Sequence, residues 1–196
     1  MRYLALVLMT TFLGPSLARA GDLSGLGNQL LDMQVRAMTP WRQNDGDMQV
    51  VVANAPNDKG RDTVPRLLFF GRAPNGMALQ YSEEGEIAPV AVFQTNSVGG
   101  PLLVIWGSGT GLIVRAYALV NGKIQRVLDD GSFRMPEVIH PNISDDSTVD
   151  IVLAEPGWVE VNGTKEKRAT AARRYRWNGS QFAKVGTSDW AKRIAR

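Results

Sequence analysis

Pro65-Arg66-Leu67-Leu68-Phe69-Phe70-Gly71-Arg72 recurs 36 residues further on as Pro101-Leu102-Leu103-Val104-Ile105-Trp106-Gly107-Ser108. Both stretches begin with proline, continue as an apolar run that ends in an aromatic residue, and then reach a glycine. A tyrosine follows each stretch at the same offset, Tyr81 and Tyr117. A looser third copy combines Val149–Ala154 with a tyrosine hairpin at Tyr175. A repeat of this spacing indicates stacked structural units.

Most of the chain after Pro40 has a sequence pattern typical of short strands joined by turns. Short apolar and β-branched runs alternate with turn residues, including four Asn-Gly pairs that begin at Asn75, Asn121, Asn162 and Asn178. Asparagine and glycine tolerate the positive φ that a two-residue type I′ hairpin requires. We predict antiparallel strands at Met48–Ala53, Arg66–Phe70, Val90–Gln94, Leu102–Trp106, Leu112–Val120, Lys123–Leu128, Glu137–Ile139, Val149–Ala154, Trp158–Val161, Ala171–Trp177 and Gln181–Val185.

The predicted fold class is all-β: an antiparallel meander of three to four propeller-blade-like repeats, with a short N-terminal helix. A sheet of three or four strands cannot bury both of its faces alone, so neighbouring units must bury each other. Three units are too few to close a propeller, which needs about four blades or more. We expect either an open stack or a fourth blade from residues 41–64, with a two-sheet sandwich as the alternative.

The N-terminal helix is predicted over residues 22–39. Asp22 or Ser24 provides a cap, Leu26 and Leu30 begin an apolar stripe, and Pro40 ends the helix. The predicted organisation is a signal peptide over 1–20, a helical segment over 21–40, a repeat-containing β domain over 41–186 and a basic tail over 187–196.

Residues 1–20 have the pattern of a cleaved signal peptide. Arg2 supplies the positive start, an apolar run from Leu4 to Leu13 follows, and Ala18-Arg19-Ala20 forms the cleavage site. The apolar run is shorter than the roughly 20 residues that span a membrane. We therefore expect a periplasmic or secreted protein, cleaved near Ala20 and without stable membrane insertion.

Net charge and cysteine content limit the classes of function that the chain can have. Without Arg2 and Arg19 the chain has 20 basic and 19 acidic residues, a net charge of +1, which does not favour nucleic-acid binding. Residues 165–196 hold ten of these basic residues and only two acidic ones. There is no cysteine. An exported chain without disulfides favours a bacterial periplasmic protein and excludes thiol chemistry.

Asp/Asn/Gly-rich loops precede several of the apolar runs. Asn44-Asp45-Gly46-Asp47 precedes Met48–Ala53, and a loop from Asn142 to Ser147 precedes Val149–Leu153. In this respect the chain resembles the FG-GAP and VCBS repeats of β-propellers. That resemblance implies a propeller-type fold and loops that often bind Ca²⁺, although no loop here keeps the family's full alternation of acids around a glycine.

Calcium needs six to eight oxygen ligands, several of them from carboxylates. The candidate ligands are Asp45, Asp47, Asp145, Asp146 and Asp150. The alternative is that these residues form turns by bonding to their own backbone.

Arg173-Arg174-Tyr175-Arg176-Trp177 interleaves cations with aromatic residues. On a strand, Arg174 and Arg176 share one face, and the other three residues share the opposite face. Such a strand suits nucleic acid or an acidic glycan, and a sheet with one packed aromatic face and one charged outer face explains it equally well. We assign Arg174, Arg176, Lys165 and Lys167 as the candidate ligand or partner surface.

Catalytic signals are weak. His140 is the single histidine and has no nucleophile motif near it, and a zinc site lacks further ligands. Glu83, Glu84 and Glu86 are predicted to form a solvated turn rather than a catalytic carboxylate pair. We therefore predict an exported, non-catalytic domain that binds a protein or glycan in the periplasm and has no cofactor. The alternatives are a carboxylate-dependent glycan hydrolase and a Ca²⁺-stabilised β module.

Overall fold

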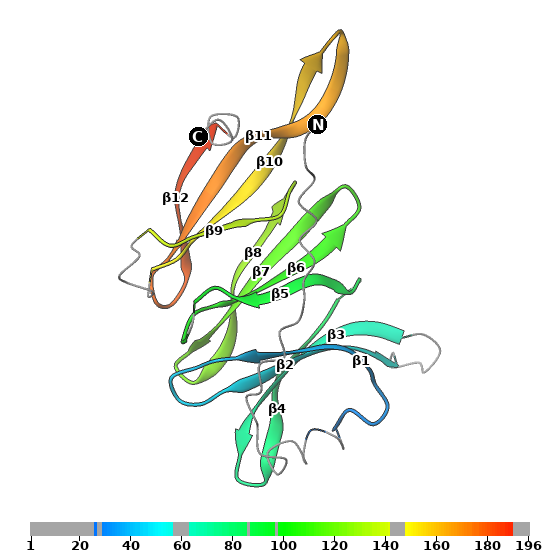
Figure 1. Cartoon of the computed structure of the whole chain (residues 1–196), viewed down its shortest axis with the longest axis vertical. Helices are drawn as coiled ribbons and strands as arrows, with labels where there is room; N and C mark the ends of the chain where they lie inside the picture. The colour runs from blue at the N-terminus through cyan, green and yellow to red at the C-terminus, as the bar shows by residue number, and fades with distance from the viewer. Residues whose placement is uncertain are drawn as a thin grey trace, which may run out of the picture.

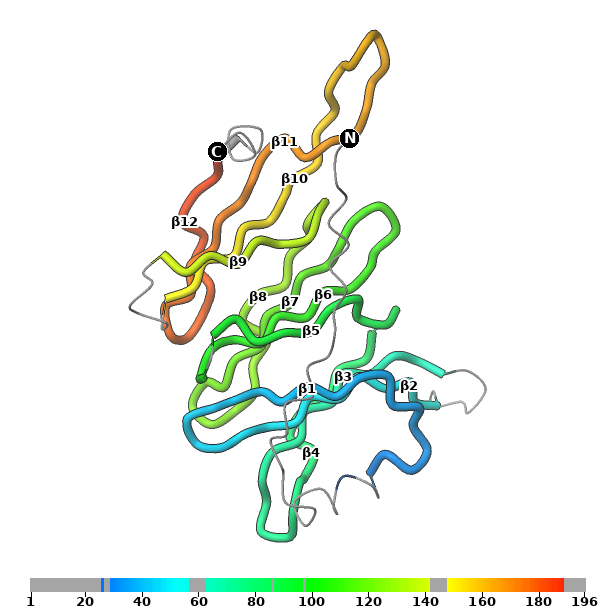
Figure 2. The backbone as a smooth tube through the Cα atoms, viewed as in Figure 1, coloured from blue at the N-terminus to red at the C-terminus, as the bar shows by residue number. Residues whose placement is uncertain are grey.

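Three four-stranded antiparallel sheets follow one another along the chain and along the long axis of the molecule (Figures 1 and 2). This computed structural model describes residues 26, 29–56, 63–85, 87–96, 98–141 and 148–189. The first sheet contains β1 (Gln34–Trp41), β2 (Met48–Pro56), β3 (Thr63–Ala73) and β4 (Gly76–Glu84). The second contains β5 (Pro89–Gln94), β6 (Leu102–Ser108), β7 (Gly111–Val120) and β8 (Lys123–Ser132). The third contains β9 (Glu137–Ile139), β10 (Asp150–Val161), β11 (Thr164–Trp177) and β12 (Phe182–Asp189).

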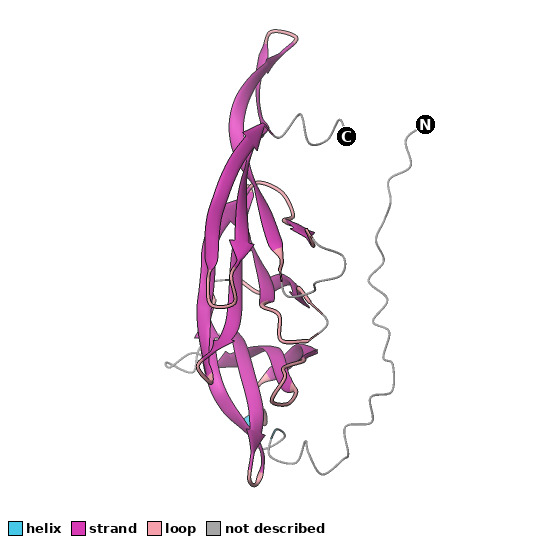
Figure 3. Ribbon diagram, turned by 90° about the vertical axis from the view of Figure 1, so that its left-hand side faces the viewer, coloured by secondary structure: helices cyan, strands magenta, loops and turns pink. Residues whose placement is uncertain are grey.

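Each sheet is a meander in which consecutive strands pair. The predicted all-β class with propeller-blade-like units is therefore confirmed, and within the described residues the units number three. Residues 48–56 do not start a separate blade, because β2 pairs with β1 and β3 in the first sheet. The two-sheet sandwich is wrong, since the sheets stack in an open series (Figure 3).

The helix prediction over residues 22–39 is wrong from Gln34 onward. Leu26 and Gln29 are helical, but residues 34–41 form the edge strand β1. Pro40 does not end a helix. It lies within β1, where an edge strand tolerates a residue that cannot donate a hydrogen bond on its open side. At the other end, β12 continues to Asp189, three residues beyond the predicted domain boundary.

Two of the four Asn-Gly pairs form the predicted turns. Asn121 and Asn162 adopt φ of 52° and 51°, and each is followed by a glycine of positive φ in a two-residue hairpin. The pair at Asn75 is shifted, because Gly76 already pairs with Ala73 in the ladder. Asn178 starts a four-residue loop, in which its side-chain oxygen accepts hydrogen bonds from the backbone of Ser180 and Gln181.

Apolar side chains fill both junctions between sheets. Between the first and second sheets, the fully buried Phe69 ring lies 5.6 Å from the Trp41 ring and 5.2 Å from the Tyr117 ring. Between the second and third sheets, β7 alanines and Val114 pack against Ile151 and Leu153 of β10. Each sheet therefore depends on its neighbour for burial, as in other repeat folds.

The two outer faces of the stack differ. On the first sheet, the apolar side chains of Leu68 and Phe70 are covered by Leu26, Leu30 and Met33 from the N-terminal segment. On the third sheet, a small buried apolar patch is bordered by charged residues: Val152, Ala154 and Ala172, with Phe133, Ile139 and Ala169 packed against them. The third sheet thus ends the stack with a more polar face.

Candidate binding surface

The outer face of the third sheet brings together the four cations predicted as a ligand surface. Side chains alternate along a strand, and Val152 and Ala154 of β10 lie on the outer face, opposite Arg174 and Ala172 of β11. In the same register Arg176 pairs with Asp150, Lys167 with Trp158 and Lys165 with Glu160. Besides the apolar patch of Val152, Ala154 and Ala172, this outer face contains Glu137, Asp150, Pro156, Trp158, Glu160, Lys165, Lys167, Arg174 and Arg176.

Asp150 is the only fully buried charged side chain among the described residues, with a relative exposure of 0%. Arg176 Nε donates to its Oδ1 at 2.8 Å and Arg176 Nη2 to its Oδ2 at 3.0 Å. Arg174 donates to Oδ2 through Nε and pairs with it through Nη2. Burial raises the pKa of Asp150, but the hydrogen bonds and charges of the two arginines outweigh it and hold the pKa below its ordinary value. The carboxylate thus remains charged and holds both guanidinium groups in place.

The second sheet shows what these positions contain when another sheet covers them. In the equivalent register Ala116 and Ala118 stand where the third sheet has Arg174 and Arg176. Pro101 likewise stands where the third sheet has Asp150. The arginine pair and its buried acid are therefore specific to the face that no other sheet covers.

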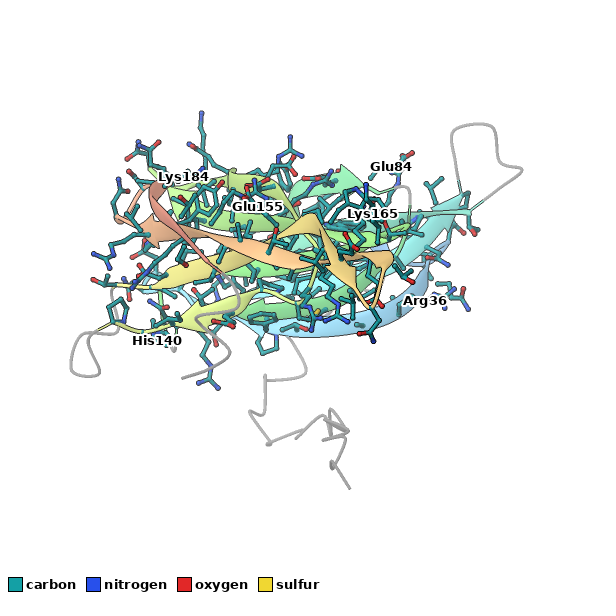
Figure 4. All side chains as sticks on the ribbon, turned by 90° about the horizontal axis from the view of Figure 1, so that it is seen from above. Arg36, Glu84, His140, Glu155, Lys165 and Lys184 are labelled. Atoms are coloured by element: carbon teal, nitrogen blue, oxygen red, sulfur yellow. The ribbon has the colours of Figure 1, made fainter. Side chains whose placement is uncertain are left out.

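Beyond the sheet, β10 and β11 continue as a two-stranded arm, residues 156–169, which projects at one end of the molecule (Figure 1). Neither β9 nor β12 pairs with this part. Trp158 lies on the arm and is 70% exposed. Lys167, directly across from it, also places its ammonium 5.9 Å from the Phe133 ring. The arm therefore carries Trp158 away from the body of the fold, while Lys167 reaches back toward Phe133. Figure 4 looks onto the third sheet, with Lys165 and Lys184 toward opposite ends.

The predicted strand faces of Arg173–Trp177 are confirmed. Arg173 and Tyr175 point to the second sheet, where Arg173 Nη1 donates to both oxygens of Asp130 at 2.7 Å and the Tyr175 hydroxyl donates to Oδ2 at 2.5 Å. Trp177 packs in the same junction, 5.3 Å from the Phe182 ring. We call this arrangement the second clasp.

A similar arrangement, the first clasp, joins the first and second sheets. Glu83 of β4 accepts Arg115 Nη1 at 2.6 Å and Arg126 Nη1 at 3.2 Å on Oε1, and the Tyr117 and Tyr81 hydroxyls at 2.8 and 3.0 Å on Oε2. The prediction that Glu83 lies in a solvated turn is wrong, because the residue is in a strand and its side chain is only 12% exposed. Glu84 is exposed and pairs with Arg66, and Glu86 lies outside the described residues. Both clasp carboxylates are fully engaged in joining sheets.

Sequence reasoning did not find the clasps. They depend on a bulge that recurs between the last two strands of every sheet, at Gln80, Val127 and Val185. Relative to the bulge, Glu83 and Asp130 are equivalent, and Ser188 takes their place in the third sheet. One sequence feature could have indicated the clasps: the pattern Arg-x-Tyr, which occurs at Arg115 and again at Arg173.

Three of the five predicted calcium ligands are among the described residues, and they lie at two separate places. Asp45 and Asp47 lie in the β1–β2 loop and line a groove of about 520 Å³ with Arg72 and Lys123. Asp150 is in the third sheet and is bound by arginines, while Asp145 and Asp146 lie outside the described residues. No group of three potential metal ligands occurs in the part of the chain that the structure describes. His140 directly follows β9.

Comparisons with known proteins add no assignment: no protein-family model matches the chain, and no curated protein matches its sequence. Among the described residues, no helix has the length and apolar character to cross a membrane. The signal peptide predicted over residues 1–20 lies outside the described residues.

Proposed function

We propose that this protein is an exported, non-catalytic binding domain whose ligand lies on the outer face. The observation that carries the proposal is the convergence of Arg174, Arg176, Lys165 and Lys167 with the exposed Trp158 on one face of one sheet. Exposed tryptophan and arginine are typical of binding surfaces because they combine a large contact area with directional hydrogen bonds.

Two further points belong to the same proposal. The protein acts in the periplasm or outside the cell after cleavage near Ala20, with a protein or glycan as its partner. The three sheets are divergent relatives of FG-GAP and VCBS repeats, which the order of strands within each sheet supports. A hydrolase has less support, because the best-positioned carboxylates, Glu83 and Asp130, are saturated by arginine and tyrosine donors. A Ca²⁺-stabilised module has less support as well, because two arginines occupy Asp150 in the third sheet, whereas Asp45 and Asp47 lie in a loop of the first.

Oxidative footprinting tests the proposal without knowledge of the ligand. The purified mature protein is exposed to hydroxyl radicals alone and in periplasmic extract of the producing cells, and oxidation is measured residue by residue. We expect extract to protect Trp158, while Met38, an exposed residue of the first sheet, is oxidised equally in both samples. Equal oxidation of Trp158 in both samples would overturn the assignment of this face.

A further inference from the structure

We propose that the ligand of the outer face is an acidic polysaccharide that lies along β10 and β11 and is bound at two subsites. This inference rests on the proposed function and specifies the chemistry of its ligand. One subsite is the arginine pair over Asp150, and the other is Trp158 with the arm lysines.

The arginine pair has the composition of a carboxylate site. Two guanidinium groups face one buried carboxylate, and Glu137 of β9, which is exposed, is the other acid on this part of the face. The contacts with Asp150 use Nε and Nη2 of each arginine. Among the described residues no partner contacts Nη1 of either arginine, so these donors can bind a ligand. Arginines held in fixed geometry bind carboxylates well, because little side-chain freedom is lost on binding.

The arm has the composition of a sugar-stacking site. The Trp158 indole is exposed, flat and rigid, which suits the apolar C–H face of a sugar ring. Lys167 lies directly across from it and Lys165 two residues further on, so that cations border the ring. On this face of β9, β10 and β11 four cations stand against three acids, Glu137, Asp150 and Glu160, an excess of one positive charge.

The distance between the subsites favours a polymer over a small anion. Arg174 pairs with Val152, and Trp158 is six residues further along the same strand. At about 3.3 Å per residue the separation is roughly 20 Å, which several sugar units are needed to span.

The edges of the arm argue against the alternative of an added peptide strand. Pro156 cannot donate a ladder hydrogen bond from β10, and the facing strand presents Lys165, Lys167 and Arg168. Proline and lysine on open edges are features that prevent strand addition. Recognition therefore falls to the side chains of the face and not to the backbone of the arm.

Calorimetric titration with a defined oligogalacturonate of about ten units tests the inference, with a neutral oligoglucan of the same length, a polyglutamate peptide and anionic phospholipid vesicles as competing probes. We expect the oligogalacturonate to bind at least about tenfold more tightly than every other probe, and to bind more weakly as salt rises, because salt screens exposed charges. Equal or tighter binding of any other probe would overturn the assignment.

Variants separate the two subsites. Trp158→Ala, and Lys165→Gln with Lys167→Gln, are expected to weaken binding of the oligogalacturonate about tenfold each. Arg174→Lys keeps the charge beside Asp150 and loses the planar donors, and is expected to weaken binding about fivefold. Lys123→Gln, at an exposed turn of the second sheet, is the matched control and should bind as wild type does. If all variants bind equally, the two-subsite site is wrong.

The failure of this inference differs from the failure of the proposed function. If the oligogalacturonate does not bind but extract still protects Trp158 from oxidation, the acidic-glycan assignment is wrong and the binding face stands. If neither is observed, both are wrong.

Discussion

The Tyr117 hydroxyl donates a hydrogen bond to Glu83 Oε2 at 2.8 Å, across the boundary between the second and first sheets. The Tyr117 side chain is fully buried, and its ring lies against Phe69 in the core. Removing the Glu83 carboxylate would leave the buried Tyr117 hydroxyl without its acceptor, a costly loss for a buried polar group. The junction between the first and second sheets is therefore held by a hydrogen bond of defined geometry as well as by apolar packing.

Glu83→Gln removes the charge that two arginines and two tyrosines share. We expect it to lower the free energy of unfolding by about 2–4 kcal/mol, because breaking a buried ion pair leaves uncompensated charge. Glu84→Gln is the matched control: this neighbouring side chain is 57% exposed and makes one ion pair, so a change within about 0.5 kcal/mol is expected. Urea unfolding followed by circular dichroism measures the free energy of unfolding of both variants. Equal losses in the two variants would show that the first clasp does not stabilise the fold more than an exposed ion pair does.

Tyrosine ionisation gives a pH prediction. Residues 21–196 contain three tyrosines, Tyr81, Tyr117 and Tyr175, and all three donate to clasp carboxylates. Burial, followed by the hydrogen bond to Asp130, raises the pKa of Tyr175 to about 12, and burial with Glu83 raises the pKa of the other two. The ultraviolet absorbance of the folded protein should therefore show little tyrosinate near the ordinary pKa of about 10.

The effect on stability follows from the same shifts. A tyrosine whose pKa is higher in the folded state contributes stability that is complete below pH about 10 and is lost as pH rises toward 12. We expect the urea midpoint to fall over this range, and to fall less steeply in Tyr175→Phe. A midpoint that is flat from pH 9 to about 12, or tyrosinate absorbance at pH about 10 in folded protein, would contradict the clasps.

Gly85 directly follows β4 and lies against the ring of Trp106. A Cβ there would lie 2.1 Å from Cζ3 of Trp106, whose side chain is 2% exposed. The ring cannot retreat, because it is packed in the core and Arg115 lies over it at 5.5 Å. We expect Gly85→Ala to destabilise the protein by about 1–3 kcal/mol, the usual effect of overpacking. Gly186→Ala is the control, since no atom lies within 4 Å of its added Cβ, and thermal unfolding should leave its midpoint nearly unchanged.

The sequence predicts central strands better than edge strands for a physical reason. Central strands such as β2, β6 and β10 are buried on both faces and appear as continuous apolar runs. The edge strands β1 and β4 are mostly exposed or half-buried, so neither has an apolar run that marks it as a strand. Val35, Met38 and Leu79 are all more than 40% exposed. This is why the sequence pattern predicts the end of a helix where the structure has β1.

The 36-residue sequence repeat identifies repeated sheets but not their boundaries. It aligns β3 and β4 with β6 and β7, which are the last two strands of one sheet and the middle two of the next. Tyr81 and Tyr117, related by this repeat, consequently meet at one carboxylate instead of occupying equivalent places in two sheets. The bulges set the true register, and a bulge is a property of strand pairing that single-strand patterns do not contain.

The outer face was only partly predictable. Strand alternation correctly placed Arg174 and Arg176 together, because period two follows from backbone geometry alone. Asp150 was predicted as a calcium ligand, since a sequence pattern cannot show that two arginines from the neighbouring strand occupy its carboxylate. The sequence predicts Trp158 only as part of a strand. Its exposure could not be predicted, because it depends on how far β10 extends beyond its partner β9.

Because the third sheet touches the rest of the fold through the second, weakening the second clasp should loosen one end of the stack. Asp130→Asn removes the negative charge and one of the two acceptor oxygens that Arg173 and Tyr175 use, with little change in side-chain volume. In repeat proteins, stability is close to a sum of unit and neighbour terms, so a weakened junction releases the terminal unit first. We expect faster amide hydrogen exchange in β10 and β11 and unchanged exchange in β2 and β3.

Asp129→Asn is the control for this experiment. Asp129 precedes Asp130 in β8 and is 41% exposed, and its ion pairs within the described residues are with Arg115 and Arg126, on the side of the first clasp. It should leave exchange in β10 and β11 as in wild type, because its carboxylate does not contact the third sheet. A uniform increase across all three sheets in Asp130→Asn would mean that the stack unfolds as one cooperative unit and that its junctions cannot be loosened separately.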